Sequence, residues 1–417
     1  MRIAVIGSGI SGLASAWLLH RRHDVRVFEK QGRPGGHTHT VLHSHHGRQL
    51  ALDTGFIVFN HSTYPNLTRF LARLDVMTQP SDMSFSVSCP DPDLEYAVHS
   101  VRGLFAQPSN LVSFAFLRML VDIVRFGRLG RKILAGPDDP APTIGDFLSA
   151  GNFSETFANY YLLPMTAAIW SSGTQLASSY PRDALLKFLA NHGLLQVTGQ
   201  PEWRTVSGGS HAYVREVAAA LEGRIHLDAR ITTIVRRHSD VELHMEDGSV
   251  DRFDHVVIAT HADQALGLLN DPADDERELL GRWTYSRNRT WLHTDTSLLP
   301  RRRSAWASWN YLLPGGTGPQ HSACVTYHLN RLQRLEDETQ FLVTLNPPHE
   351  PAPAKTIRHM TYTHPIYTRD SVATQSDLPR LNGRRRTHFC GAYFGNGFHE
   401  DGLNSAIAVA DDLGVPF

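Results

Sequence analysis

The sequence contains little cysteine and no long apolar run. Its three cysteines are scattered, odd in number and form no CxxC pair, which predicts reduced thiols in a cytoplasmic protein. No stretch approaches the roughly 18 apolar residues of a spanning helix, and the first apolar run, which ends in glycines, does not resemble a signal peptide. The 40 basic and 41 acidic residues nearly balance, so the chain has no excess of positive charge that would bind a polyanion. We therefore expect no nucleic-acid partner.

What the sequence does contain, near its N-terminus, is a GxGxxG motif between an apolar strand and a helix. Its glycines are Gly7, Gly9 and Gly12, and a second strand, Val25 to Phe28, leads to Glu29. Gly7 makes the sharp turn, Gly9 lets the backbone approach a pyrophosphate, and Gly12 lets helix and strand pack closely. The N-terminus of the helix then holds phosphate, and Glu29 accepts hydrogen bonds from ribose hydroxyls. This arrangement predicts a dinucleotide-binding βαβ unit.

The residues after Glu29 indicate which dinucleotide is bound. Arg33 and the pair Gly35-Gly36 stand where an NAD-binding domain normally continues into its next helix. A flavin protein instead turns the chain back along the cofactor, and the glycines leave room for N–H groups beside phosphate and flavin. Arg33 then neutralises phosphate charge; the alternative is a solvated loop arginine. Only one GxGxxG occurs, which argues against a second nucleotide domain, so FAD fits better than NAD.

At 417 residues the chain is long enough for two or three domains with a large core. We predict an α/β fold in which a Rossmann-like FAD-binding domain is assembled from residues 1–85, 205–270 and 375–417. The remaining residues, 86–204 and 271–374, would form an α+β substrate domain with an antiparallel sheet and a helical block.

The clearest helical pattern covers residues 111–134, with Arg118, Asp122, Arg125 and Lys132 on one polar face. Other helices are predicted at 143–150, 154–163 and 181–195. Strand patterns occur at 224–235, 241–245, 251–253, 256–260, 290–294, 305–311, 324–328 and 341–345, and a strand, glycine turn and closing helix at 387–413.

These motifs, together with Phe389-Cys-Gly391 and Gly397 to Ser405, resemble the FAD-dependent amine oxidase and phytoene desaturase group over nearly the whole chain. The runs at 53–60, 64–67, 305–311 and 343–347 are similar to a bacterial subfamily of NAD/FAD-binding, flavin-containing amine oxidase-like proteins. That subfamily is associated with cyclopropane-fatty-acid-synthase-like methyltransferases. The resemblance implies an FAD cofactor, a lipid substrate and such a methyltransferase as functional partner.

The resemblance also implies the cofactor contacts. The glycine turn would hold the pyrophosphate, Glu29 the adenosine ribose, and the backbone of Ile231 the adenine. The closing helix, which starts near Gly402, would direct its positive end at the N1–C2=O2 edge of the flavin. The usual Thr-Glu pair is absent after Gly391, so the acidic ribityl contact is missing or replaced. The expected FAD-binding residues are Gly7, Gly9, Ile10, Ser11, Gly12, Glu29, Lys30, Arg33, Gly35, Gly36, His37, Thr38, Thr54, Gly55, Phe56, Ile231, Gly391, Phe398, Gly402 and Leu403.

Two residues are candidate catalytic groups. His399 precedes the closing helix, and Tyr327 lies on the predicted sheet of the substrate domain. The alternatives are a packing or hydrogen-bonding role for His399 and a core position for Tyr327. Amine oxidases usually present a lysine near flavin N5, and none of the four lysines (Lys30, Lys132, Lys187 and Lys355) clearly falls there. This weakens a literal amine-oxidase interpretation.

Two further patterns have competing interpretations. The HxH spacing within residues 37–46 suits zinc or copper, but no Cys or Asp set accompanies it and His46-Gly47 predicts a hairpin turn, so we expect no metal. The basic segment 111–134 either lies on the inner face of an anionic membrane or covers the substrate domain as an ordinary amphipathic helix.

Three functions follow. The favoured one is an FAD-dependent oxidoreductase that transfers hydride from an acyl chain to flavin N5, which predicts a long apolar tunnel. The second is an amine oxidase for a small amine or polyamine, which predicts aromatic walls with acidic groups. The third is a non-catalytic FAD-binding partner of a lipid methyltransferase, which predicts a large exposed apolar patch.

Overall fold

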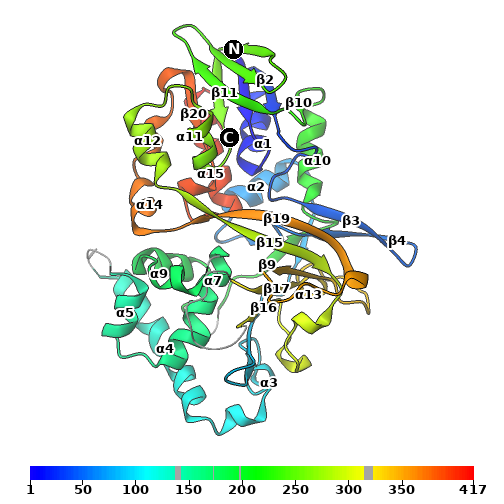
Figure 1. Ribbon diagram of the computed structural model, residues 1–417, viewed down its shortest axis with the longest axis vertical. Coiled ribbons are helices and arrows are strands. Elements are labelled where there is room, and N and C mark those ends of the chain that lie inside the picture. Colours follow the sequence, from blue (N-terminus) through cyan, green and yellow to red (C-terminus); the bar gives the residue numbers. More distant parts are fainter. Residues whose placement is uncertain (137–141, 172, 197–198, 314–322) are drawn as a thin grey trace.

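The computed structural model describes residues 1–136, 142–171, 173–196, 199–313 and 323–417 (Figure 1). A parallel sheet with its helices forms one end of the molecule, and a block of helices forms the other. The two longest strands, β15 (Thr284–His293) and β19 (Thr356–Ile366), cross between these ends. Both termini lie at the end that contains the parallel sheet.

The parallel sheet has five strands in the order β10-β2-β1-β14-β20. All four pairs in this sheet are parallel. The strands are β1 (Arg2–Ile6), β2 (Asp24–Phe28), β10 (Ile225–His226), β14 (His255–Ile258) and β20 (Thr387–Phe389). They therefore come from three distant parts of the chain. We retain the three-piece division of the FAD-binding domain as a proposal.

Both faces of this sheet are covered, which explains why its central strands are almost entirely apolar. Ile3 and Val5 face a core formed with α1, α2, α10 and α15, whereas Ala4 and Ile6 face the opposite core under the meander β11-β12-β13. These helices and strands are α1 (Ile10–Leu19), α2 (Pro65–Arg73), α10 (His211–Ala220), α15 (His399–Asp412), β11 (Ile231–Arg236), β12 (Val241–Met245) and β13 (Val250–Phe253). The predicted single strand at 224–235 is wrong, because Asp228 has a φ of 54° and separates β10 from β11.

The second sheet has seven strands in the order β19-β15-β18-β17-β16-β7-β8. The strands predicted in this region pair antiparallel, as expected. The sheet is mixed because β16 also pairs in parallel with β7. The prediction also lacked three of the strands, β7, β8 and β19. The predicted run at 305–311 becomes a strand only from Trp309, after a short helical turn at Arg303–Ala305. The strands not yet defined are β7 (Phe85–Cys89), β8 (Leu94–Ala97), β16 (Trp309–Leu312), β17 (Val325–His328) and β18 (Leu342–Leu345).

The helical block differs from its prediction at three helix ends. α4 begins at Phe114 because the Ser113 hydroxyl caps it, accepting from the N–H of Phe116. The helix predicted at 154–163 continues to Trp170, and a π turn before Pro164 accommodates the missing N–H. α9 ends at Asn191, followed by Gly193 with a φ of 69°. The helices are α3 (Val101–Leu104), α4 (Phe114–Leu134), α5 (Ile144–Ala150), α6 (Glu155–Phe157), α7 (Leu163–Trp170), α8 (Thr174–Ser178) and α9 (Arg182–Asn191).

The remaining elements are a hairpin, a small three-stranded sheet and several short helices. The histidine-rich segment forms the hairpin β3–β4, whose turn holds His46 and Gly47 at positive φ, as predicted. A three-stranded sheet has the order β5-β9-β6, in which β9 comes from a distant part of the sequence. These elements are β3 (Thr40–His45), β4 (Arg48–Asp53), β5 (Val58–Asn60), β6 (Thr78–Pro80), β9 (Trp203–Val206), α11 (Ala262–Leu268), α12 (Asp274–Gly281), α13 (Leu329–Leu332) and α14 (Arg369–Thr374).

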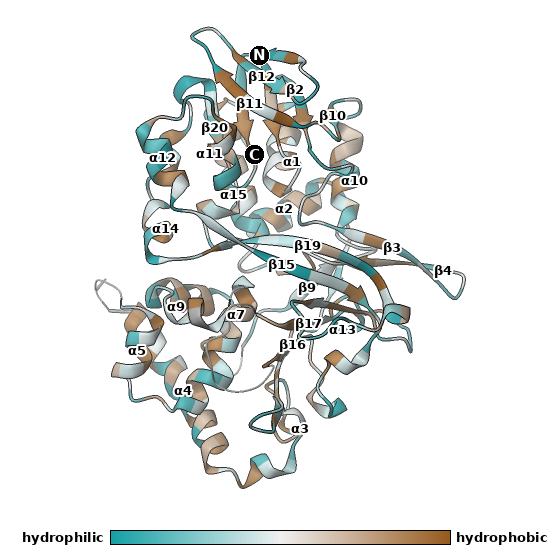
Figure 2. Cartoon of the chain, in the orientation of Figure 1, coloured by the Kyte–Doolittle hydropathy of each residue, from teal (hydrophilic) through white to brown (hydrophobic). Residues whose placement is uncertain are grey.

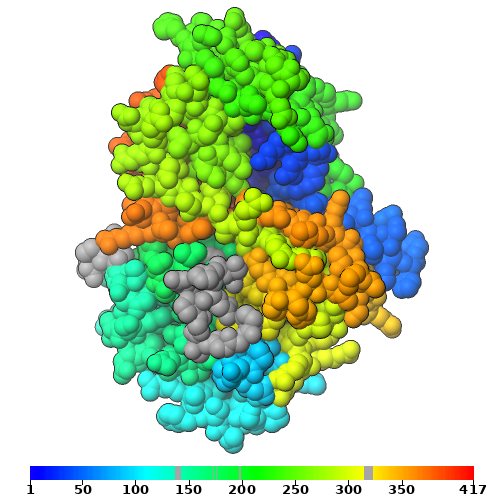
Figure 3. All heavy atoms as spheres, viewed as in Figure 1, coloured from blue at the N-terminus to red at the C-terminus, as the bar shows by residue number. Residues whose placement is uncertain are grey.

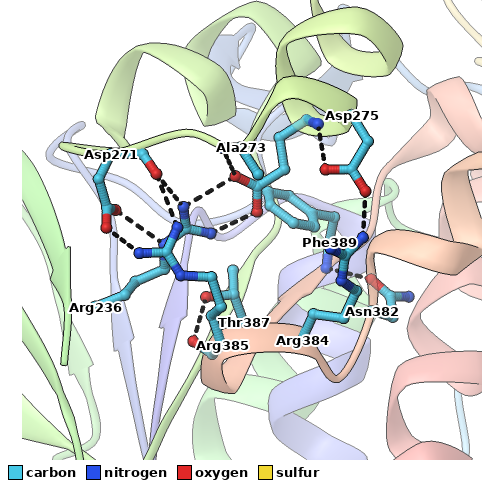
Figure 4. Close-up of polar contacts among 10 residues, drawn as sticks. Arg236, Asp271, Ala273, Asp275, Asn382, Arg384, Arg385, Thr387 and Phe389 are labelled. Carbon is cyan, nitrogen blue, oxygen red and sulfur yellow. Dashed lines mark hydrogen bonds and ion pairs between the residues drawn. The ribbon is translucent and has the colours of Figure 1, made fainter. Parts of the chain in front are cut away.

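A charged network joins three distant segments at the end that contains the parallel sheet (Figure 4). Arg236 on β11 is fully buried and forms two hydrogen bonds with the carboxylate of Glu276 on α12, at 2.5 and 2.9 Å. Arg236 also bonds Asp271, which in turn accepts from Arg385 next to β20. The network therefore connects β11, α12 and the segment before the last strand.

Candidate functional site

A cavity of about 1660 Å³ runs from the glycine turn after β1 to helix α4. It exceeds the range of about 300–1,000 Å³ usual for ligand pockets, so it has room for a dinucleotide and a further ligand. Figure 3 shows the surface hollowed where dark blue N-terminal residues lie behind the green ones. The cavity is lined by the ends of β1, β2 and β14, by β19, and by the inner sides of α4, α7 and α9.

The glycine turn suits the phosphates of a dinucleotide. Gly7 has a φ of 95°, and a Cβ there would lie 2.9 Å from the Ala259 carbonyl oxygen. Gly9 lines the cavity, and a Cβ on it would meet no atom within 4 Å, so open space lies directly beside the backbone. The first turn of α1 contains no acidic residue and no side-chain cap, which leaves its N–H groups available to an anion.

Glu29 stands at the end of β2, as the spacing predicted, and its carboxylate is almost fully buried against the glycine turn. One of its oxygens accepts from the Ser8 N–H at 2.9 Å and from the Ser8 hydroxyl at 2.6 Å, and the other accepts from the Gln31 N–H at 2.9 Å. These bonds fix the carboxylate where it also lines the cavity. The turn and the acid are therefore one preorganised unit.

The loop with the glycine pair is bound to the same unit. The Gly35 N–H donates to the Ser8 carbonyl at 2.9 Å, and Gly36 packs so closely on Gly9 that its Cβ would lie 2.9 Å from the Gly9 Cα. Arg33 donates to the Gly36 carbonyl at 2.9 Å and to the Thr38 carbonyl at 3.3 Å, and burial lowers its pKa. Arg33 is therefore half-buried, lines the cavity and holds the loop through two backbone carbonyls. This contradicts the alternative of a solvated loop arginine.

Three histidines face one another in the middle of the cavity. The rings of His261 and His364 lie 6.1 and 5.3 Å from the ring of His37, which donates to the Thr363 carbonyl at 3.0 Å. His261 stacks on Tyr285 with ring centroids 4.2 Å apart. Burial lowers the pKa of His261 and of His364 to about 3, and that of His37 as well. This wall of the cavity is thus polar but uncharged at neutral pH.

The candidate catalytic residue His399 is held on three sides. Its ring stacks on Phe56 at 3.8 Å, and its Nε2 lies 2.9 Å from the Thr38 hydroxyl and 3.4 Å from the Tyr213 hydroxyl. Burial lowers its pKa to about 3, so the imidazole is neutral. His399 lines the cavity and is positioned by its neighbours; a catalytic role for it remains a prediction.

The closing helix α15 packs against α1, but its N-terminus is not free. Asp401 accepts from the Phe398 N–H at 2.9 Å, and Glu400 accepts from the N–H groups of Asn66 and Leu67 at the start of α2. These two carboxylates share the positive end of the helix, which limits what its dipole adds at the cavity. Ala392 and Tyr393 follow Gly391, where the sequence lacks the usual acid. Both line the cavity. The buried hydroxyl of Tyr393 has no hydrogen-bond partner among the described residues.

Most of the predicted site residues line the cavity, including both catalytic candidates. Those that do not are Gly12, Gly35, Thr38, Gly402 and Leu403. Some of them pack directly against residues that line the cavity or lie in the core. A Cβ on Gly402 would lie 2.8 Å from the hydroxyl oxygen of Ser11, and Leu403 is fully buried in the hydrophobic core. The lining residues are Gly7, Gly9, Ile10, Ser11, Glu29, Lys30, Arg33, Gly36, His37, Thr54, Gly55, Phe56, Ile231, Tyr327, Gly391, Phe398 and His399.

Several residues that line the cavity are not indicated by the motifs of the sequence. His261 lies three residues after the end of β14, and its place beyond the carboxyl end of a parallel strand was a usable signal. Tyr362 and His364 lie on β19, a strand that was not predicted. Tyr362 lies 2.6 Å from the Thr54 hydroxyl and 2.8 Å from His39 Nδ1. No pattern in the sequence pointed to these contacts.

The far part of the cavity is apolar and ends at basic residues. Leu120, Ile123 and Val124 on α4 face it, together with Met165 and Ile169 on α7. Arg128 and Arg131, one and two turns further along α4, also line it. Since Val124 and Arg128 are exposed as well, the cavity reaches the surface beside α4.

Two kinds of feature are absent from the residues that the structure describes. No group of three or more His, Cys, Asp or Glu side chains there is placed to hold a metal ion. Among the helices of the same described ranges, none combines the length and the apolar character needed to cross a membrane.

Comparison with known proteins places the fold. The profile of a family described as flavin containing amine oxidoreductase matches residues 10–414. A fatty acid isomerase from P. acnes that produces CLA has a similar structure, with a TM-score of 0.69, 18% identity and coverage of 99% of this chain and 98% of that one. Putrescine oxidase bound to putrescine gives a TM-score of 0.67, 15% identity and 99% coverage of both chains. Cyclohexylamine oxidase from Brevibacterium oxydans gives a TM-score of 0.67, 16% identity and 99% coverage of both chains. No curated protein matches the sequence.

Proposed function

Because the chain belongs to the flavin containing amine oxidoreductase family, whose members are FAD-dependent oxidoreductases, we propose that it oxidises the acyl chain of a lipid or fatty acid. The reaction would be of the desaturase or dehydrogenase type. When bound, FAD supplies the hydride acceptor. The residues present fit that cofactor: the open space beside Gly9, the uncapped start of α1 and the fixed carboxylate of Glu29 suit pyrophosphate and ribose.

The observation that carries the proposal is the charge of the cavity lining. Glu29 is the only acidic residue among the described residues that line the cavity, and its carboxylate already binds Ser8 and Gln31. The apolar part contains no carboxylate to pair with an ammonium group, whereas Arg128 and Arg131 stand at its end. Burying an unpaired cation there is costly, but an alkyl chain with an anionic or uncharged head suits such a lining.

The chain's own residues supply binding and positioning. The apolar side chains of α4 and α7 would hold the alkyl chain, and the neutral histidines would order the polar wall without adding charge. At a pKa of about 3, His364 and His399 hold no extra proton at neutral pH, so neither is expected to act as an acid there. The fatty acid isomerase with a similar structure is consistent with an acyl substrate, although at 18% identity the likeness extends to the fold alone.

The test is anaerobic bleaching of the flavin absorbance of the purified holoprotein. We expect bleaching with fatty acids or phospholipids and none with putrescine, spermidine or cyclohexylamine. Bleaching by amines alone would contradict the acyl proposal. A methyltransferase partner and a cytoplasmic location are predictions from the resemblance and from the cysteine content, and interaction and fractionation experiments would examine them separately.

Amine oxidation is a second candidate because aromatic side chains wall the centre of the cavity. Tyr285, Tyr362 and Tyr393 face it, and Tyr285 stacks on His261. Such walls can hold a cation over ring faces. Two structurally similar proteins are a putrescine oxidase and a cyclohexylamine oxidase. The same bleaching experiment separates this candidate from the first, since the two substrate classes are tested in parallel.

A further inference from the structure

At the end of the molecule opposite the parallel sheet, Figure 2 shows hydrophobic residues along α3 and the first part of α4, and several of them are exposed. Seven of the twelve large hydrophobic residues exposed within the described ranges fall between positions 101 and 124. Val112 and Phe114 are 85% and 82% exposed. We call this set the apolar tip; its members are Val101, Leu111, Val112, Phe114, Leu117, Val121 and Val124. So dense a cluster is unusual for a surface that faces only water.

Helix α4 changes character along its exposed face. Phe114, Leu117, Val121 and Val124 follow one another at spacings of three and four residues, so they lie on one side of the helix. The same side continues with Arg128, and Arg131 and Lys132 flank it. Over about 30 Å of helix the solvent side is apolar in its first half and basic in its second.

The polar face predicted for this helix is only partly exposed. Asp122 is fully buried, where it pairs with Arg125 at 3.0 Å and with Arg118 at 3.4 Å and accepts from the Ser154 N–H. In the first half of α4 the predicted polar face therefore lies partly inward at Asp122, while Arg118 and Arg125 remain partly exposed. The inward side buries Phe116, Met119 and Phe126, so the apolar tip is a second, unpartnered apolar side.

The segment that carries the apolar tip and the rest of α4 is strongly basic. Between residues 101 and 136 there are six basic residues and one acid, Asp122, which is satisfied by its two arginines. Beside Val101, a small hollow is lined by His99, Arg102, Arg303 and Arg331, of which Arg331 is already paired with Asp82 at 2.6 Å. An apolar surface with a basic border complements a bilayer with anionic head groups, in which apolar side chains enter the interface and cations stay at head-group level.

The cavity also points to a bilayer. Val124 belongs both to the apolar tip and to the lining of the cavity, and Leu120 and Ile123 on the adjacent side of α4 line it too. One helix thus lies between the apolar surface and the apolar interior. An acyl chain leaving a bilayer at this surface would remain among apolar groups as it entered the cavity.

We propose that the apolar tip and the basic second half of α4 form a docking surface for an anionic lipid bilayer. The proposal goes beyond the proposed function and needs no turnover, so the two can fail separately. Docking would be peripheral, because none of the helices described is suited to span a membrane.

The experiment uses FAD-loaded full-length protein and flotation with vesicles of phosphatidylcholine alone or mixed with phosphatidylglycerol. We expect binding to the anionic vesicles, weakened by added salt. The double substitution F114S/V121S should reduce binding by at least about tenfold, because apolar burial in the interface is lost. R128Q/K132Q should reduce it by about tenfold or more, since each cation near an anionic surface contributes roughly fivefold.

The matched control is M77S, which removes a side chain that is 71% exposed but lies outside the apolar tip. Flavin content and thermal unfolding confirm that each variant is folded. Equal vesicle binding by wild type and F114S/V121S, or no binding by wild type, would overturn the proposal. So would a dimer, measured by light scattering without lipid, that F114S/V121S dissociates, because a second copy would then cover the surface. If lipid bleaches the flavin but vesicles do not bind, only the docking proposal fails.

Discussion

At the residue scale, the three glycines of the N-terminal turn are required for different reasons. Gly7 has positive φ, and Gly12 has no room, since its Cβ would lie 1.9 Å from the Gly7 carbonyl oxygen. Gly9 has ordinary extended backbone angles and open space beside it. Two of these glycines are therefore needed by the fold, and the third only by what fills the cavity.

The first prediction separates these roles. Gly9→Val should leave the fold intact but lower FAD affinity on the order of 100-fold, because the new side chain obstructs charge-assisted hydrogen bonds worth about 1.5–3 kcal/mol each. Gly12→Ala should destabilise the fold by about 3 kcal/mol or more, since the clash is with backbone. Urea unfolding of the apoprotein and FAD titration measure the two effects. Equal instability of both variants would show that Gly9 is structural.

The second prediction concerns the neutral histidines. Burial holds the pKa of His261, His364 and His399 at about 3 in the folded chain, against about 6.5 when unfolded. Between these values the unfolded state binds more protons at these histidines, so their contribution to the free energy of unfolding should fall as pH drops from about 6.5 toward 3 and stay flat above that window.

Each histidine contributes a slope of at most about 1.4 kcal/mol per pH unit. His364→Gln should therefore reduce the acid sensitivity of unfolding, whereas His238→Gln, at an exposed position, should not. Urea unfolding from pH 4 to 8 provides the comparison. Parallel curves for wild type and His364→Gln would mean that His364 is already protonated or exposed in the folded protein.

At the element scale, the sequence was informative where one local rule determines the outcome. The βαβ unit, the hairpin between β12 and β13 and the buried strand β14 follow from glycines, turn residues and apolar runs, and the structure confirms them. Strand β19 was not predicted, because polar and partly buried residues occupy both of its faces and leave no clean alternation. Its ten pairs with β15 join residues about 70 positions apart, and no local pattern encodes such pairing.

The third prediction concerns the network that joins β11 to α12. Arg236→Met leaves the Glu276 carboxylate buried without its partner and should lower the free energy of unfolding by about 3–5 kcal/mol. The double substitution R236M/E276L removes both charges and should recover most of that loss. Arg237→Met, which removes a side chain 55% exposed and paired with Glu242, should cost at most about 1 kcal/mol. A double variant as unstable as R236M would show that the network is needed for more than charge balance.

At the scale of the whole molecule, the decisive feature is one cavity whose lining runs from Ile6 to His399. The end of the cavity beside the glycine turn could be predicted, because a GxGxxG turn followed by an acid at this spacing is typical of dinucleotide binding. The apolar end could not, because helices and strands far apart in sequence build it, and apolar residues on α4 and α7 look like ordinary core in the sequence. The near absence of acidic side chains from the described cavity lining likewise becomes apparent only in the folded structure.

The last prediction tests whether the apolar end holds substrate. Ile123 lies on the cavity side of α4, so Ile123→Trp should fill part of the channel and slow flavin bleaching by a long acyl chain by at least about tenfold, equivalent to about 1.4 kcal/mol in the barrier. FAD content should not change, because the glycine turn lies at the other end. Leu42→Trp, at a position 63% exposed on β3, is the control for adding a bulky ring. If a short acyl chain loses as much rate as a long one, the tryptophan disturbs the flavin end, and the apolar part is not the acyl channel. If only the long chain is slowed, the length of the cavity selects the substrate, since a short chain would not reach α4.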